Sequence, residues 1–444
     1  MKKKLLILPL LYSSFAFGQS SLKPQIIQKS DAIEKKVIEW RHDFHQNPEL
    51  SNKEFRTAKI IAAHLRSLGI EVQEGVALTG VIGLLKGGKP GPVVALRADM
   101  DALPVPERND LPYKSNVTDT YNGQKTGVMH ACGHDSHVAI LMGVAEVLSS
   151  MKSEIAGTVK FIFQPAEEGV YGSNEPFGAN AMVKAGCLEN PKVDAIFGLH
   201  INSQTEVGKI RYKPEATMAA VDDLNIIVKG VQTHGAAPWS GVDPIVTASQ
   251  IVMGLQTIVS RSVNVTENPA VVTVGAIHGG IRNNIIPESL EMKGTIRTFG
   301  KEQQALVHRR ITEIATNIAE SAGAKANVDI HVGYPVTFND PKLTAEMLPT
   351  LENIAGKDNV LLSPAITGAE DFSYYQEKVP GLFIFLGGMP KGKDPKDAAP
   401  HHTPDFLIDD AGFNLGVKAL SSLTVDYLEK HATVAASPAK KAKK

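Results

Sequence analysis

The segment VVALRADMD, from Val93 to Asp101, decides the fold because a short apolar run typical of a buried strand leads directly into acidic side chains. Two later segments repeat this arrangement. Residues 158–163 are followed by QPAEEG at 164–169, and residues 195–199 are followed by His200. Parallel α/β sheets place their sites just beyond the carboxyl ends of their strands. The sequence therefore predicts one sheet that gathers acids and imidazoles along one edge.

A second segment, HACGHDSH at 130–137, concentrates side chains that bind metals. They are His130, Cys132, His134, Asp135 and His137. Thiolate and imidazole satisfy a borderline-soft ion of the zinc type, and carboxylate suits a harder ion, so the cluster predicts a metal site. An ion with four or five ligands cannot use all of them, and His130 and His137 are individually better explained as supporting or ordinary residues. The alternatives are a nucleophilic cysteine with its base, or polar residues that begin a helix.

The composition is that of an ordinary globular protein. With 444 residues, 43% of them hydrophobic and 21% charged, the chain is long enough for about two or three domains. A net charge of -1 gives no electrostatic reason to expect nucleic acid or an anionic membrane as a partner. A small molecule is therefore the expected ligand.

The two ends of the chain differ from its interior. Residues 1–18 place three lysines before an apolar stretch that contains Pro9 and ends in small residues, which predicts a removable export signal and a periplasmic or secreted protein. A membrane anchor needs about 20 uninterrupted apolar residues. Cys132 and Cys187 are the only cysteines, and we expect no structural disulfide between them. The lysine-rich segment 433–444 is expected to be a disordered tail.

The order of the patterns predicts a catalytic domain formed by two segments of the chain on either side of an insertion. The first segment covers residues 28–213, with a helical pattern over 29–68 that breaks at Asn47-Pro48-Glu49 and an apolar helix at 138–151. Residues 214–331 alternate strands and helices with few polar groups at strand ends, which predicts a smaller α+β domain. The second catalytic segment covers residues 332–432 and contains a strand at 382–386.

Glu167 and Glu168 follow a predicted strand and a Gln-Pro turn. Adjacent residues in an extended segment point to opposite sides, so one carboxylate can bind a metal while the other faces water as a base. Two adjacent glutamates are more often a solvated pair. Their place after an apolar strand favours the functional interpretation.

Six motifs, in order, resemble the aminoacylase and glutamate-carboxypeptidase superfamily of co-catalytic metallopeptidases. They are RADMDALPV at 97–105, MHACGHDSH at 129–137, QPAEEG at 164–169, GLH at 198–200, GAEDF at 368–372 and HTPDF at 402–406. The resemblance is to the amidohydrolase branch, which includes N-acyl-amino-acid amidohydrolases, hippurate hydrolases and auxin-conjugate hydrolases. It implies an α/β fold: a metallopeptidase-like catalytic domain with a central, mostly parallel sheet, and an inserted smaller α+β lid or dimerisation domain.

The resemblance also implies a role for individual residues. Cys132 resembles the thiolate that bridges two divalent ions (zinc, manganese, cobalt or nickel), and the remaining ligands match His134, Glu168, His200 and His402. Glu167 matches the general acid/base. His402 is preferred over His401 because the family's histidine directly precedes the Ser/Thr-Pro step. The wider superfamily has His-x-Asp where this chain has Asp99-Met100-Asp101, so Asp101 is expected to orient a ligand and Asp99 has no assigned role.

The insertion resembles the family's lid through residues 228–245 and 282–287. In that resemblance His234 binds substrate and stabilises the oxyanion, often in the site of the partner subunit, and Asn284 lines the same region. This implies a homodimer or a higher homo-oligomer. From the residues alone, a single histidine beside Gly235 is better explained as structural.

The function that follows is hydrolysis of an N-acyl amino acid by a metal-activated water, with Glu167 as the base. A metallo-exopeptidase, a dipeptidase or carboxypeptidase of the same superfamily, is the alternative. A thiol hydrolase that uses Cys132 as its nucleophile and an inactive periplasmic binding protein are less favoured. No motif fixes the acyl group, the amino acid or the native metal.

Overall fold

The computed structural model describes residues 22–170 and 176–435. The predicted export signal at 1–18 lies outside the described residues, as do residues 436–444 of the predicted tail. Within the described ranges, no helix is long and apolar enough to cross a membrane.

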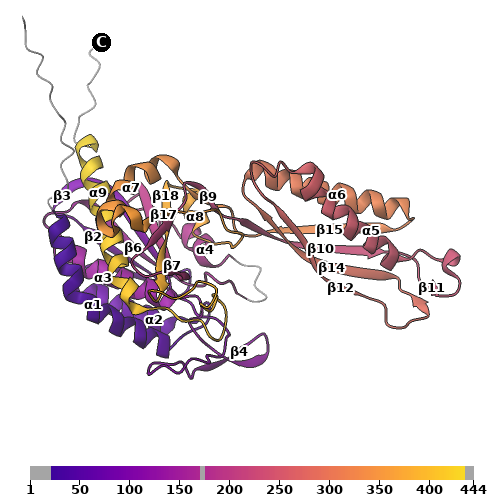
Figure 1. The fold of residues 1–444 in the computed structure, drawn as a ribbon, viewed down its shortest axis with the longest axis horizontal. Coiled ribbons are helices and arrows are strands. Elements are labelled where there is room, and N and C mark those ends of the chain that lie inside the picture. The colour runs from indigo at the N-terminus through magenta and orange to yellow at the C-terminus, as the bar shows by residue number, and fades with distance from the viewer. Residues whose placement is uncertain (1–21, 171–175, 436–444) are drawn as a thin grey trace, which may run out of the picture.

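The larger domain is built on an eight-stranded mixed sheet (Figure 1). In spatial order its strands are β1 (Glu71–Val76), β2 (Gly80–Lys86), β6 (Ala156–Gln164), β3 (Lys89–Asp99), β7 (Ala195–Glu206), β18 (Gly381–Met389), β8 (Ile210–Tyr212) and β17 (Val360–Leu362). The central strands β6, β3, β7 and β18 are parallel, whereas β1, β2 and β8 each form antiparallel pairs. The prediction of a mostly parallel central sheet is confirmed.

Helices cover both faces of this sheet, which explains why its central strands are apolar on both sides. One face packs against α1 (Lys23–Gln46), α2 (Phe55–Ser67), α3 (His134–Ser149), α7 (Pro341–Ala355) and α9 (Phe413–Ala435). The other face packs against the short helices α4 (Gly178–Lys184) and α8 (Ser373–Gln376). The break at Asn47-Pro48-Glu49 falls between α1 and α2, as predicted.

The inserted domain contains a separate antiparallel sheet. Its strands, in spatial order, are β12 (Val271–Gly279), β14 (Ser289–Thr298), β10 (Ala220–Lys229) and β15 (Lys325–Val332). Helices α5 (Pro244–Thr257) and α6 (Lys301–Ser321) bury their apolar faces on this sheet. Asp243 caps α5 by accepting hydrogen bonds from the backbone N–H groups of Ile245 and Val246. The domain projects away from the larger sheet (Figure 1).

Short strand pairs complete the fold. They are β4 (Thr118–Tyr121) with β5 (Gln124–Gly127), β9 (Glu215–Met218) with β16 (Thr337–Asn339), and β11 (Thr233–His234) with β13 (Ile285–Ile286). The hairpin β4–β5 belongs to the catalytic domain, and the pair β11–β13 lies at the end of the inserted domain that is farther from the large sheet (Figure 1).

Two predicted boundaries differ from the structure. His200, expected just beyond a strand, lies inside β7, because β18 pairs with β7 past this point and sets Phe385 opposite His200. Helix α9 continues to Ala435, into the segment predicted as a tail, because residues 433–435 contain no glycine or proline to end it.

Candidate metal centre

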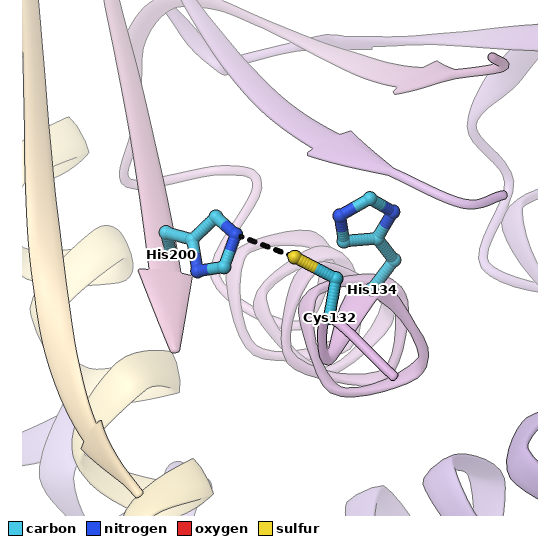
Figure 2. Close-up of side chains that lie close together, drawn as sticks. All are labelled: Cys132, His134 and His200. Carbon is cyan, nitrogen blue, oxygen red and sulfur yellow. Dashed lines mark hydrogen bonds between the residues drawn. The ribbon is translucent and has the colours of Figure 1, made fainter. Parts of the chain in front are cut away.

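The centre of the site is the sulfur of Cys132, in the loop before α3. Cys132 Sγ lies 3.4 Å from His200 Nε2 and 3.3 Å from His402 Nε2. Figure 2 shows the cysteine between His200 and His134. The loop is tight: Gly133 has φ 96°, and a Cβ there would meet Ile201 Cγ2 at 2.3 Å. Glycine therefore lets Cys132 and His134 face the same point.

His134, the first residue of α3, has one ring nitrogen held and the other free for a ligand. Its Nδ1 lies 2.9 Å from the carbonyl oxygen of Asp101 and 3.3 Å from Asp101 Oδ1. Its Nε2 is buried and makes no hydrogen bond within the described residues. The acidic oxygen nearest to Nε2 is Asp99 Oδ2 at 3.6 Å, which is too long for a hydrogen bond. A buried imidazole nitrogen without a hydrogen bond is costly unless it binds something, and a metal ion fits it.

Glu167 and Glu168 lie on a turn whose backbone N–H groups are held by the side-chain carboxylate of Asp101. The N–H groups of Glu167 and Glu168 each donate to one oxygen of the Asp101 carboxylate, at 3.0 Å. Ala166, just before them, has φ 52°, a left-handed conformation that costs energy for any residue with a Cβ. Glu168 Oε1 lies 3.0 Å from His402 Nε2. The two carboxylates therefore enter the site at fixed positions.

The five predicted ligands meet in overlapping groups. Potential ligand atoms lie within 4.8 Å of one another in each of three sets: Cys132, His134 and His200; Cys132, Glu168 and His402; and His134, Glu167 and Glu168. A thiol shared by two sets, with imidazoles and a carboxylate around it, is a donor combination that suits borderline-soft divalent ions. The residues present therefore fit a metal centre.

The neighbouring His401 is placed differently from His402. His401 Nδ1 is 3.7 Å from Cys132 Sγ, and its Nε2 accepts a hydrogen bond from the backbone N–H of Ser203. His402 is closer to the sulfur and also meets Glu168. His402 adopts φ 62°, so its side chain is aimed at the cluster by a strained backbone.

Other residues of the HACGHDSH segment serve as supports. His137 uses both ring nitrogens, with Nδ1 2.6 Å from Asp99 Oδ1 and Nε2 accepting from the backbone N–H of Ile201. Asp135 pairs with Arg41, Nε to Oδ2 at 3.0 Å, away from the sulfur. Asp99, left without a role in the sequence analysis, therefore orients His137 and also lies 3.6 Å from His134.

A buried arginine that the sequence analysis did not single out neutralises the acids behind the site. Arg97 donates to Asp99, Glu370 and Asp371 at 2.7 to 2.9 Å. Burial nevertheless raises the pKa of both Glu370 and Asp371, although Arg97 acts to lower them. Asp99 lies two residues from Arg97 in β3, whereas Glu370 and Asp371 lie 273 and 274 residues away, so only the folded structure brings the two adjacent acids to the arginine.

Charge and burial shape the two central reactive groups. Burial, with Glu370 and Glu168 close by, raises the pKa of Glu167 well above its usual range. Burial, with Glu168 and Glu167 close by, likewise raises the pKa of the Cys132 thiol. Burial and the neighbouring acids thus oppose formation of the thiolate, and a cation bound in the cluster would favour it.

A pocket of about 340 Å³ opens onto the cluster. Its lining includes Cys132 and Glu167 together with the apolar side chains of Met218, Ile366 and Phe385. Among the described residues of the chain, no lysine or arginine lines this pocket. The pocket thus combines a polar reaction centre with an apolar wall.

His234 and Asn284 lie together but far from the pocket of their own chain. His234 pairs with Ile285 across β11 and β13, and the backbone N–H of Gly235 donates to the carbonyl of Asn284. His234 is exposed. Figure 1 shows β11 at the outer end of the inserted domain, so His234 does not contact the candidate metal cluster within one subunit.

Comparison with known proteins identifies the family. The model of peptidase family M20/M25/M40 matches residues 95–425. The chain belongs to this family. M20 relatives include thermostable carboxypeptidase 2 of Saccharolobus solfataricus, 40% identical over 401 residues that cover 90% of this chain and 97% of that protein. The N-acetyl-L-cysteine deacetylase of Bacillus subtilis is 39% identical over 380 residues, 85% of each chain.

A solved M20 structure is also similar. The YXEP protein of Bacillus subtilis, described as a dinuclear metal binding peptidase, matches with a TM-score of 0.75 and 36% identity, over 90% of this chain and 99% of that one. Family membership and the donor set at Cys132 make the present protein a metal-dependent M20 hydrolase of amide or peptide bonds. The resemblance inferred from the motifs is thereby confirmed.

Proposed function

We propose that this M20 hydrolase cleaves the amide bond of N-acyl amino acids and releases a carboxylic acid and an amino acid. The observation that carries the proposal is the buried carboxyl of Glu167 beside the Cys132 cluster, in a pocket with an apolar wall. The relative from Bacillus subtilis that is named a deacetylase supports it.

The proposed cofactor is a pair of divalent ions, zinc, manganese, cobalt or nickel. Cys132, His134, Glu168, His200 and His402 would hold these ions, and the Cys132 thiol belongs to two of the groups of neighbouring ligand atoms. When bound, such ions supply Lewis-acid polarisation of a carbonyl and lower the pKa of water. Asp101 keeps His134 and the backbone of both glutamates in place for this arrangement.

Glu167 is the proposed general acid/base. It accepts the proton of the attacking water, which then adds to the amide carbonyl carbon, and it returns that proton to the departing amine. Burial and the carboxylates around Glu167 raise its pKa and favour its protonated form, which suits the second of these steps. The positive charge of bound ions would favour the ionised form needed for the first.

His234 of the partner subunit is the proposed oxyanion donor, and Asn284 of the partner subunit is proposed to contact the substrate. The distance between β11 and the pocket in one chain supports an arrangement in which two subunits exchange these residues (Figure 1). The active unit is accordingly proposed to be a homodimer or a higher homo-oligomer.

The pocket wall bears on the choice between amidase and peptidase. An uncharged acyl group can pack on Met218, Ile366 and Phe385, where a charged amino group would be desolvated. The same pocket is also lined by the carboxyl groups of Glu167, Glu168 and Glu370, which could pair with such an amino group, so the substrate assay decides between the two classes. A metallo-exopeptidase is the second candidate, because a relative of similar identity is named a carboxypeptidase. A thiol hydrolase is disfavoured by the raised pKa of Cys132, and a binding protein would have no need of Glu167.

The decisive experiment loads the purified protein separately with zinc, manganese, cobalt and nickel. Each form is assayed against N-acetyl, N-benzoyl and indoleacetyl amino acids and against simple dipeptides. We expect turnover of one or more acyl amino acids to exceed that of dipeptides. Glu167→Gln is the control, expected to keep its metal and lose roughly 10² to 10⁴ of turnover. Preferential cleavage of dipeptides would replace the proposal with the exopeptidase.

We also propose that the protein is exported and that residues 1–18 are removed. The three lysines, the apolar stretch with Pro9 and the small residues that follow support this. The mass of the protein recovered from its native cells, together with fractionation, tests it. A full-length chain in the cytosolic fraction would contradict the proposal.

A further inference from the structure

The chain passes between the two domains twice, at the start of β10 and just after β15, and these two segments, the linkers, are hydrogen-bonded to each other. Val221, at the start of β10, exchanges backbone hydrogen bonds with the segment that follows β15: Gly333 N–H donates to Val221 O at 3.0 Å, and Val221 N–H donates to Tyr334 O at 3.1 Å. A Cβ on Gly333 would lie 2.5 Å from Val221 O, so glycine permits this close approach. The linkers therefore form one connection rather than two independent strands.

Tyr334 extends from this connection into the catalytic domain. Its hydroxyl donates a hydrogen bond of 2.6 Å to the backbone carbonyl of Glu167. Its ring lies edge-on to Phe177 and Tyr374, with centroids 6.2 and 6.1 Å away, and it lines the pocket. One side chain thus joins the inserted domain to the backbone of the proposed base.

The turn that contains Glu167 depends on such contacts. The backbone N–H groups of Ala166, Glu167 and Glu168 are held by two carboxylates of the catalytic domain, those of Glu54 and Asp101. The left-handed Ala166 is strained and persists only when its surroundings fix it. Tyr334 fixes the same turn through the carbonyl of Glu167, and it does so from the linker.

We propose that Tyr334 is a positioning residue that holds Glu167 in place from the connection between the two domains. The inference rests on the proposed role of Glu167 as general acid/base. If the phenol hydrogen bond is lost, the peptide between Glu167 and Glu168 keeps only the hydrogen bond from Glu168 N–H to Asp101, so the Glu167 end of this peptide can tilt and shift the Glu167 carboxylate. A displacement on the order of 1 Å is enough to lower a rate about 100-fold.

The first test compares Tyr334→Phe with Tyr374→Phe. Tyr374 is a matched control, because its hydroxyl donates to Gly333 O at 3.1 Å in the same linker and does not contact Glu167. We expect Tyr334→Phe to lower kcat about 10- to 100-fold, with KM and metal content nearly unchanged because the ring remains. Tyr374→Phe should retain most of kcat. Equal losses in the two variants would overturn the inference.

The second test places Tyr334→Phe in a Glu167→Gln background. A residue that acts through Glu167 has nothing left to position there, so the double variant should turn over substrate at the rate of Glu167→Gln alone. A purely structural defect would multiply the two losses, and that result would refute the positioning role. Near-normal activity of Glu167→Gln would overturn the proposed function and this inference together. An inactive Glu167→Gln with a fully active Tyr334→Phe would overturn the inference alone.

Discussion

Replacing Gly133 with alanine tests whether the loop between Cys132 and His134 requires glycine. Two costs are expected. A residue with a Cβ at φ 96° pays about 1–2 kcal/mol for the left-handed backbone. A Cβ at 2.3 Å from Ile201 Cγ2 also forces buried atoms apart, which costs a further 1–3 kcal/mol, roughly the range for overpacking. The sum is about 2–5 kcal/mol of unfolding free energy.

Gly69→Ala is the matched control. Gly69 has φ 70°, follows α2 and has no atom within 4 Å of an added Cβ, so only the backbone cost applies, about 1–2 kcal/mol. Urea unfolding of both metal-free variants, followed by near-ultraviolet circular dichroism, measures the two losses. Competition with a chelator then measures metal affinity, which Gly133→Ala should weaken and Gly69→Ala should leave unchanged.

The comparison separates steric conflict from backbone strain. If both variants lose the same stability, the contact with Ile201 does not limit the loop. If Gly133→Ala binds metal as tightly as the wild type, the conformation of Gly133 does not position Cys132 and His134. Either result would refute the reasoning about this loop.

Three further predictions concern ligand, assembly and charge. Cys132 should resist alkylation in the metal-loaded protein and react after chelation, as mass spectrometry would show; rapid alkylation of the loaded form without metal loss would favour a thiol nucleophile. His234→Ala and Glu167→Gln, each nearly inactive, should regain some activity when co-assembled, since one site of the mixed dimer receives both intact residues; mixtures as inactive as their parents would place His234 outside the partner's site. Arg97→Met should lower the unfolding free energy of the metal-free protein by about 3–5 kcal/mol at pH 8. The loss should shrink at pH 5, because carboxyls with raised pKa values protonate in the folded state as the pH falls, and a loss that grows instead would contradict this.

Much of the fold could be predicted because short stretches of the sequence indicate which segments form buried strands and which form helices. Continuous apolar runs marked β3, β6 and β18, and these strands are buried on both faces of the sheet. The inserted domain was marked by alternating strand and helix patterns, and in the structure the inner residues of β10 pack under α5 and α6. The end of β7 was not predictable from its own residues, because pairing with β18 extends it beyond His200.

The candidate site also contains residues that the sequence indicated and residues that only the folded structure revealed. The five proposed ligands were identified because motifs carry them, and the structure brings them together; their role as ligands stays a prediction. Arg97 begins the motif at 97–105, but nothing in the motif indicated its partners, and Tyr334 gave no local signal of function because a tyrosine after a strand is an ordinary residue. Their partners, Asp371 and Glu167, lie 274 and 167 residues away in the chain, and only the fold joins them.

The position of β18 within the sheet governs the order in which the molecule can be assembled during synthesis. This strand, residues 381–389, lies between β7 and β8, which the ribosome produces long before it. Until β18 emerges, β7 exposes an unpaired edge to its surroundings. The contact between Cys132 and His402 spans 270 residues, so this contact with the thiol can form only after β18 has also been synthesised. A nascent chain therefore carries an incomplete sheet and an open cysteine loop for most of its translation, and the candidate metal centre can close only after His402 has been synthesised.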